Sequence, residues 1–397
     1  MRVLLIQPYG VRRYPSALRM SMDRMLWAQI ETLFPQAAAV AKIPPQNRAS
    51  HWIDWFAAHL PREITVTSEF NHYGDLPNTL GAGNVSAIGR YHPAYYENRP
   101  EGYAGVAWER YPSNFGFPPP RFLPLSQVSR NFKQFDVVLG SIKMGEDARP
   151  LLRQAKRAGL PVALFDNIDH EAAYIDPKAD LFRGFGLDEF DLFFKKDIPL
   201  ANDDPRLVPI CPVPTKSAPL EPQTPWDERR NDLFFVGAYR QGTTRRDRQD
   251  LCDVLAPAFP LAKLLVNKPP ISLGEHDEEV RRTRIPLSPS GRVWCSFRHT
   301  DYGRFGSPVV LPRPNCKTAG PPIVDMKHAI LYETRLVDGE HRLVDSDTLI
   351  DKIRFMLSDP IAANQMGLAY YDMIEAGHTT QARSRYISDQ LQQRLTL

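Results

Sequence analysis

Residues 135–166 decide the fold class, because they read as strand, helix and strand in close succession: FDVVLG (135–140), ARPLLRQAKRAG (148–159) and LPVALFD (160–166). The two apolar runs are short and continuous, which is typical of strands buried on both faces of a sheet. A glycine ends the helical segment between them. This order predicts a parallel sheet with helices on its faces.

Further strand patterns fall into two sets. VLLI (3–6) and DEFDLFFKK (188–196) extend the first set, whereas NDLFFVGAY (231–239), LAKLLVN (261–267) and SPVVLP (307–312) form a second. Both sets alternate with helical segments, so we expect an α/β protein made of two Rossmann-like, doubly wound domains. Such domains bind ligands outside the carboxyl ends of their strands, and two that face each other enclose a cleft.

Changes in composition predict the domain boundaries. Residues 70–127 are rich in Gly, Pro, Tyr and Phe and show no usable periodicity, which indicates a folded insertion or lid, or else a tail-like loop. A proline-rich stretch further on is typical of an extended linker. The predicted organisation is an N-terminal domain over 1–215, a linker over 216–228, a C-terminal domain over 229–375, and a helix over 376–397 that returns to the N-terminal domain.

Length and composition limit the class of protein. The 397 residues are too many for one ordinary core, so two domains are expected. A hydrophobic content of 43% and a charged content of 24% are typical of a globular protein. The formal net charge of +3 allows an anionic ligand, but it falls short of the strongly basic character of a dedicated nucleic-acid binder.

The four cysteines (Cys211, Cys252, Cys295 and Cys316) are far apart in the sequence and include no CxxC pair. This spacing favours a reduced protein without a structural zinc, so we expect no metal site. The opening MRVLLIQPYG holds too few apolar residues for a signal peptide, and no apolar run is long enough to span a bilayer. We therefore expect a cytoplasmic protein, either free or peripheral to a membrane.

The stretch WCSFRHTDYGRFGSPVV (294–310) carries the most specific set of polar residues. A short helix starting near Ser296 would place Arg298 and Asp301 one turn apart on one face. A carboxylate at a helix start suits a pair of ribose hydroxyls, and an arginine suits a diphosphate. His299, like His378, lacks the spacing of a zinc motif and is expected to be a hydrogen-bonded structural residue.

A second polar loop, AYRQGTTRRDR, follows the 231–239 strand pattern and its glycine, Gly237. Backbone N–H groups of such a loop, together with Arg240 and Arg245, could bind a phosphate at the start of the next helix. The alternative is a basic, solvated helix start. The spacing matches neither a P-loop nor a GxGxxG motif.

The order SPSG (288–291), SFRHTD (296–301) and GSPVVLP (306–312) resembles the donor-binding segment of GT-B glycosyltransferases, in particular the exostosin-like and spore-maturation, group-1-type families. The segment from LYE (331–333) through the helix pair DTLIDKIRFMLSDP and AANQMGLAYYDMI resembles the ending of those families. Upstream, LPVALFDNIDHEAAY and DLFFKKD resemble their acidic and basic segments. The resemblance implies a GT-B fold, in which two Rossmann-like domains face each other across a cleft.

The resemblance also implies an activity, namely hexosyl or pentosyl transfer from a nucleotide-diphosphate sugar to an acceptor hydroxyl in glycan biosynthesis. The donor is a co-substrate, and no tightly bound cofactor is implied. Asp301 stands where these families usually have a glutamate that holds the ribose. Together with the basic loop, this predicts that the donor-binding residues are Gly237, Arg240, Arg245, Ser290, Arg298, Asp301 and Lys317.

The second glutamate of the retaining families' E-x7-E pattern is absent, which favours an inverting, metal-independent mechanism. Inversion needs a general base in the cleft. The candidates are Asp166, Asp169 and His170, which follow the LPVALF strand of the N-terminal, acceptor-side domain. Their alternative role is ordinary turn formation and helix capping.

Two other functions stay open. A DNA-modifying, phage-type glycosyltransferase would use Arg90, Arg99, Arg110 and Arg121 to contact phosphates. A catalytically silent scaffold of the same fold would bind a nucleotide or a partner without turnover. The acceptor could be a glycan, a lipid-linked molecule, a protein or DNA.

Overall fold

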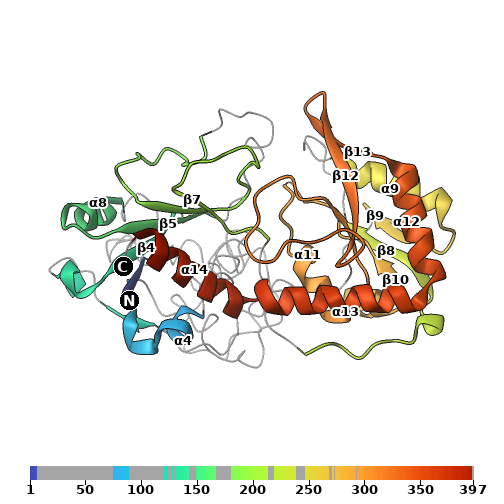
Figure 1. Ribbon diagram of the computed structural model, residues 1–397, viewed down its shortest axis with the longest axis horizontal. Coiled ribbons are helices and arrows are strands. Elements are labelled where there is room, and N and C mark those ends of the chain that lie inside the picture. The colour runs from blue at the N-terminus through green and yellow to red at the C-terminus, as the bar shows by residue number, and fades with distance from the viewer. Residues whose placement is uncertain are drawn as a thin grey trace, which may run out of the picture.

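The computed structural model of the chain describes residues 1–6, 75–88, 120–123, 127–128, 131–142, 149–166, 180–212, 219–237, 246–267, 271, 273–291 and 293–395. These residues form two α/β domains that lie side by side, each built on a mainly parallel sheet (Figure 1). The predicted fold class is therefore confirmed.

The N-terminal domain contains a seven-stranded parallel sheet in the order β3-β2-β1-β4-β5-β6-β7. The strands are β1 (Val3–Ile6), β2 (Val85–Ile88), β3 (Arg121–Phe122), β4 (Val137–Ser141), β5 (Val162–Asp166), β6 (Leu192–Lys195) and β7 (Leu207–Pro209). Its short helices are α4 (Leu76–Leu80), η2 (Ala82–Asn84), η3 (Phe132–Gln134) and α8 (Arg149–Arg157). The first strand, β1, lies in the interior of the sheet, as doubly wound folds require.

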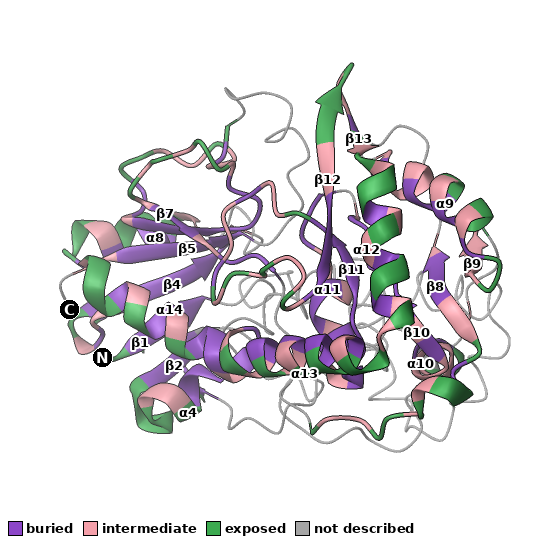
Figure 2. Cartoon of the chain, turned by 45° about the vertical axis from the view of Figure 1, so that its right-hand side comes forward, coloured by how far each residue is buried: buried purple, intermediate pink, exposed green. Residues whose placement is uncertain are grey.

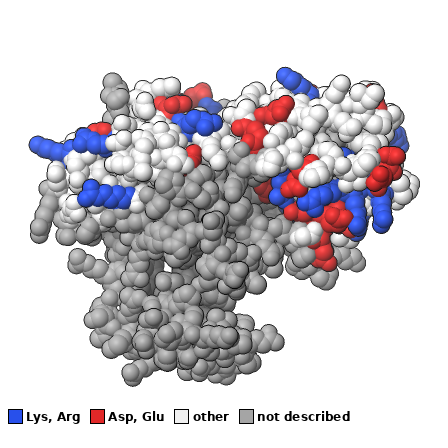
Figure 3. All heavy atoms as spheres, turned by 90° about the horizontal axis from the view of Figure 1, so that it is seen from below, with Lys and Arg blue, Asp and Glu red and all other residues white. Residues whose placement is uncertain are grey.

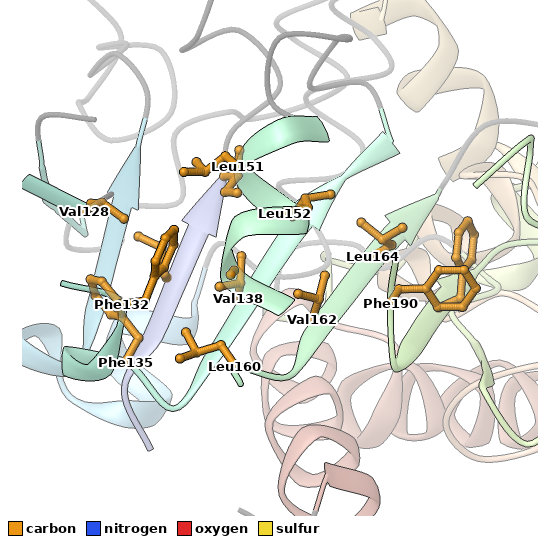
Figure 4. Packing of buried hydrophobic residues seen from close by; sticks show 14 of the residues in the cluster. Val128, Phe132, Phe135, Val138, Leu151, Leu152, Leu160, Val162, Leu164 and Phe190 are labelled. Atoms are coloured by element: carbon orange, nitrogen blue, oxygen red, sulfur yellow. The ribbon is translucent and has the colours of Figure 1, made fainter. Parts of the chain in front are cut away.

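Helices cover both faces of this sheet. On one face, Leu151 and Leu152 of α8 pack against Val138 and Val162, as Figure 4 shows. Successive strand residues point to opposite faces. Their neighbours Val137 and Ala163 therefore belong to a separate core on the other face, where α4 and the last helix lie.

The predicted insertion over 70–127 needs correction at both ends. β2 pairs with β1, and β3 pairs with β2, so both belong to the sheet itself. Strand β2 reads VSAI, and such a short run with two small residues gives no clear strand pattern in the sequence. Residues 89–119 lie outside the described part of the chain.

The C-terminal domain is built on two three-stranded sheets, β10-β8-β9 and β11-β12-β13, and an isolated parallel bridge between Leu287 and Val310 joins β10 to β11. The strands are β8 (Asn231–Gly237), β9 (Lys263–Val266), β10 (Thr283–Pro286), β11 (Val310–Pro312), β12 (Ile330–Val337) and β13 (Glu340–Val344), of which β13 alone is antiparallel to its neighbour. The helices are η7 (Trp226–Glu228), α9 (Asp247–Ala258), α10 (Leu273–Arg281), α11 (Arg298–Asp301), η8 (Tyr302–Phe305) and α12 (Ser346–Ser358).

The chain ends in two helices that connect the domains. α13 (Pro360–Gly377) begins where the Asp359 side chain accepts hydrogen bonds from the backbone N–H groups of Ile361 and Ala362. α14 (Thr380–Leu395) continues across to the N-terminal domain, where Ile387 and Leu391 are buried in its core (Figure 2). None of the described helices is both long and apolar enough to cross a membrane.

The cysteines correct another expectation. Cys211 follows β7 of the first domain, and it forms a disulfide with Cys295, which precedes α11 of the second. The sulfur of Cys316 lies 3.9 Å from that of Cys211. Three of the four cysteines therefore meet at the junction of the domains, although 84 residues separate the two that are bonded.

Candidate active site

The strand order of the C-terminal sheet indicates where a domain of this type would bind a ligand. From β8 the chain moves to β9 on one side and then returns to β10 on the other, so the order reverses between β8 and β10. In doubly wound folds the ligand binds at such a reversal, outside the carboxyl ends of the strands. Here these ends are Gly237 and Pro286.

Two arginines meet at this point. Arg298, at the start of α11, donates to the carbonyl of Val236 at 3.1 Å, and Arg248, in the first turn of α9, donates to the carbonyl of Ser290 at 2.5 Å. Both guanidinium groups lie over the ring of Phe235, at 5.4 and 5.6 Å from its centroid. These contacts are to two carbonyls and an aromatic face, and the neighbouring Asp247 carboxylate adds a negative charge beside Arg248.

The electrostatics of the pair favour an anion. Burial, and then the positive charge of Arg298, lower the pKa of Arg248. Two like charges that lie close together and are partly buried repel each other, and this repulsion raises the free energy of the folded protein. A dianionic group bound between them would remove that repulsion and form charge-assisted hydrogen bonds with both. The N-terminus of α9 adds a dipole of the same sign.

The start of α9 is fixed by a buried contact. The hydroxyl of Tyr332, on β12, donates to the carboxylate of Asp247 at 2.8 Å, and both side chains are buried. Arg248 is the next residue, so this contact sets the direction in which the helix presents its guanidinium group. Gly237 matters for a steric reason: a Cβ atom there would lie 2.6 Å from the ring of Phe235.

Asp301 lies on α11 as predicted, but its described surroundings are on the side of α13. Burial, and then the negative charge of Asp301, raise the pKa of Tyr370 on α13. No hydrogen bond or ion pair between Asp301 and Arg298 occurs among the described residues. A ribose-binding role for Asp301 stays a prediction.

Lys317 faces the other domain. Its ammonium group pairs with Asp203 at 3.1 Å, and its backbone N–H donates to the carbonyl of Ile198. Both partners belong to the N-terminal domain. These contacts give Lys317 a role in joining the domains, and its predicted contact with phosphate or sugar stays a prediction.

Asp166 is the described member of the predicted base cluster. It is fully buried at the end of β5, where its carboxylate pairs with Lys195 of the adjacent strand and with Arg183 at 2.7 Å. Burial lowers the pKa of Lys195, and the Asp166 charge opposes this. A carboxylate held by two cations is a structural ion pair in this geometry, so a general-base role for Asp166 stays only a prediction.

Four predicted site residues lie outside the described residues: Asp169, His170, Arg240 and Arg245. The structural roles expected for the two histidines are confirmed. His299 is hydrogen-bonded to Ser288 at 2.8 Å and to the carbonyl of Trp294 at 2.6 Å. His378 is hydrogen-bonded to the carbonyl of Pro321 at 3.0 Å.

The sequence analysis missed Arg248 as a site residue. It ends the basic loop motif, yet only the tertiary structure shows that it turns toward the loop after β10, which carries Ser290. A usable signal was its place in the first turn of the helix that follows β8, since that position faces the crevice of a doubly wound domain.

Charges of both signs alternate on one face of the C-terminal domain, as Figure 3 shows. In this domain Arg282 pairs with Glu278 at 2.6 Å, and Arg304 pairs with Asp277 at 2.5 Å. The described part of this face therefore carries no continuous basic tract. Of the arginines that a DNA acceptor would contact, Arg121 is described, and it is exposed on β3.

Comparisons with known proteins give structural likenesses of low similarity. HepE from Anabaena, solved with UDP and glucose, has 10% sequence identity and a TM-score of 0.42, over 98% of this chain and 99% of that chain. Sucrose-phosphate synthase from Thermosynechococcus elongatus has 12% identity and a TM-score of 0.41, over 81% and 92%. An alpha-glucosyltransferase solved with UDP and a 13-mer DNA containing an HMU base has 12% identity and a TM-score of 0.42, over 81% and 94%.

Neither a protein-family model nor a curated protein sequence matches the chain. At these scores and identities the structural likeness concerns the path of the chain alone. Evidence for the function of this chain therefore lies in its own residues.

Proposed function

We propose that the protein is a nucleotide-sugar-dependent glycosyltransferase whose donor binds in the crevice of the C-terminal domain. The observation that carries the proposal is the pairing of Arg248 and Arg298 over Phe235 at the reversal of strand order. This arrangement suits a diphosphate better than a single phosphate, because two guanidinium groups can each hold one phosphoryl unit. The resemblance of the surrounding sequence to GT-B donor segments supports a nucleotide sugar as its source.

The two arginines would act on the leaving group. As the bond between the sugar and the diphosphate breaks, negative charge grows on the diphosphate oxygens. Fixed cations and the α9 N-terminus stabilise that charge without reorganising during the reaction. The proposed mechanism therefore needs no metal ion to neutralise the leaving group.

We also propose inversion at the anomeric carbon. The eighth residue after Asp301 is Val309, which is fully buried among apolar side chains and cannot supply a second acid. The base would come from the N-terminal domain, with Asp169 and His170 as the candidates. Analysis of the product by NMR tests this part separately: a retained anomeric configuration would contradict it.

The main experiment measures nucleotide binding by isothermal titration calorimetry with UDP, GDP, dTDP and ADP. We expect at least one to bind, and Arg248→Ala and Arg298→Ala each to weaken it by roughly tenfold or more, because each removes a charge-assisted contact worth about 1.5–3 kcal/mol. The same variants should slow sugar transfer or donor hydrolysis.

Arg246→Ala is the matched control. Arg246 lies two residues from Arg248, but it pairs with Glu340 at 2.9 Å and so faces β13. Its loss should leave nucleotide affinity within about twofold of the wild type. Equal weakening by all three variants, or no binding of any nucleotide, would contradict the proposal, and binding without turnover would indicate a silent scaffold.

A further inference from the structure

Four potential metal ligands converge where the two domains meet. Cys211 and Asp197 come from the N-terminal domain, after β7 and β6, whereas Cys295 and Cys316 come from the C-terminal domain, before α11 and after β11. All four side chains are buried, with at most 4% of their surface exposed. Backbone contacts hold the segments together: Pro199 bridges to Cys316, and the N–H of Ala319 donates to the carbonyl of Cys211 at 2.6 Å.

The spacing of the four groups suits one tetrahedral ion. Ligand atoms of Asp197, Cys211 and Cys295 all lie within 4.8 Å of one another. The Cys211 sulfur is 3.9 Å from a carboxylate oxygen of Asp197 and 3.9 Å from the Cys316 sulfur. Sulfur atoms bound at about 2.3 Å around a tetrahedral zinc lie about 3.8 Å apart, close to the observed separation.

A buried positive charge beside the cluster also favours a negatively charged metal site. The guanidinium of Arg383 is fully buried, and its described contacts are to the carbonyls of Pro212 and Ala319, to His378 and to the ring of Tyr386. No carboxylate among the described residues pairs with it. Pro212 follows Cys211, so this buried cation lies next to the sulfur cluster. With the disulfide formed, the four residues carry at most the single negative charge of Asp197, whereas three thiolates and a carboxylate around a divalent ion leave two negative charges.

We propose that Asp197, Cys211, Cys295 and Cys316 bind a zinc ion in the reduced protein and so link the two domains. The disulfide and the metal site are alternative states of the same residues. A dithiol reductant breaks the Cys211–Cys295 bond by exchange: the dithiol becomes the disulfide, and both cysteines become thiols. Zn²⁺ then displaces the protons of three thiols, and the Asp197 carboxylate completes the coordination.

A zinc ion at this site would contradict the expectation, drawn from the sequence, that the protein has no structural zinc. That expectation came from the absence of closely spaced cysteines, which applies to sites formed within one segment of chain. Here each domain supplies two ligands. It is also independent of the proposed donor site, because none of the four residues contacts Arg248 or Arg298 among the described interactions.

The test uses the full-length protein, reduced with a dithiol, incubated with zinc and separated from unbound metal. We expect one zinc ion per chain by elemental mass spectrometry. Cys211→Ser, Cys295→Ser and Cys316→Ser should each lose the metal in competition with a chromophoric chelator. Cys252→Ser is the control, because Cys252 is equally buried but lies on α9 in a different core, and this variant should keep the ion.

Two further measurements leave all four proposed metal-binding residues unchanged. Cobalt bound to the reduced wild type should show the intense near-ultraviolet charge-transfer band of thiolate ligands. Arg383→Met should weaken zinc binding by about tenfold or more, as expected for a group just outside the coordination shell. Reduced wild-type protein that takes up no metal, or a cobalt complex without the thiolate band, would overturn the proposal.

Discussion

His378 shows how one residue can set the acid sensitivity of the fold. Its Nε2–H donates to the Pro321 carbonyl, and its Nδ1 faces Arg383, so the ring is neutral. Burial, and then the Arg383 charge, lower the pKa of His378 to about 3. Between roughly pH 6.5 and 3 the unfolded chain therefore binds a proton that the folded protein does not.

Stability should thus fall as the pH drops below about 6.5, by about 1.4 kcal/mol per pH unit from this group alone. Urea unfolding at pH 7.5, 6 and 5 measures the slope. His378→Gln keeps a donor for Pro321 but cannot take up the proton, so its free energy of unfolding should depend less on pH over this range. Parallel slopes for variant and wild type would contradict the assignment.

For single residues, the sequence indicated candidate site residues more readily than the contacts that those residues make. Arg298 and Ser290 were expected at the donor site, which stays a prediction; Arg298 donates to the carbonyl of Val236, and the carbonyl of Ser290 accepts from Arg248. The environment of Asp166 could not be predicted, because Lys195 becomes its partner only through the register of β5 and β6. The cysteine cluster was hidden for the same reason, since its members come from segments that meet only after both domains fold.

Among the elements, α13 lies unusually close to the loop that follows the donor segment. A Cβ atom at Gly367 would overlap the backbone carbonyl of Gly306, which ends η8 with a positive φ of 57°. Gly367→Ala should therefore lower the free energy of unfolding by about 1–3 kcal/mol, because backbone cannot move aside as a side chain can.

Gly274→Ala is the control for helix propensity. Gly274 lies in α10, and a Cβ atom there would meet nothing within 4 Å. Alanine should be neutral or add up to about 1 kcal/mol at this position. Chemical unfolding of both variants gives the comparison, and an equal effect of the two substitutions would show that α13 can shift away from Gly306.

Elements with a clear apolar run or helical periodicity were predicted from the sequence, and elements without one were not. The split of the helix pair at Asp359–Pro360 was expected, because proline cannot continue a helix and aspartate caps the next one. β7 and β10 were missed because LVP and TRIP contain no continuous apolar run, unlike the equally short VLLI of β1. The hairpin of β12 and β13 turns at Asp338–Gly339, both with positive φ, a signal present in the sequence but not used.

For the whole molecule, α14 connects the end of the described chain to the first domain. Ile387 and Leu391 are fully buried against Val3 and Val137 of that domain's sheet. Leu391→Ala should destabilise the N-terminal domain by about 2–5 kcal/mol. Hydrogen exchange should become faster in β1 and β4 and stay unchanged in β8.

Ile353→Ala gives the reciprocal control. Ile353 is fully buried on α12, in the core of the C-terminal domain. Its loss should speed exchange in β8 and leave β1 protected. If Leu391→Ala instead exposed both sheets equally, the two domains would unfold as one cooperative unit.

The position of α14 also has a consequence for synthesis on the ribosome. The C-terminal domain lies in the sequence between two parts of the N-terminal domain's core, β1 to β7 and α14. Domains generally fold in the order in which they emerge. Here the core of the domain translated first is completed only by residues 380–395, and the apolar part of its sheet that α14 covers stays exposed until then. During translation the domain made second is therefore the first that can complete its core, and the nascent N-terminal sheet presents a binding surface for chaperones throughout that interval.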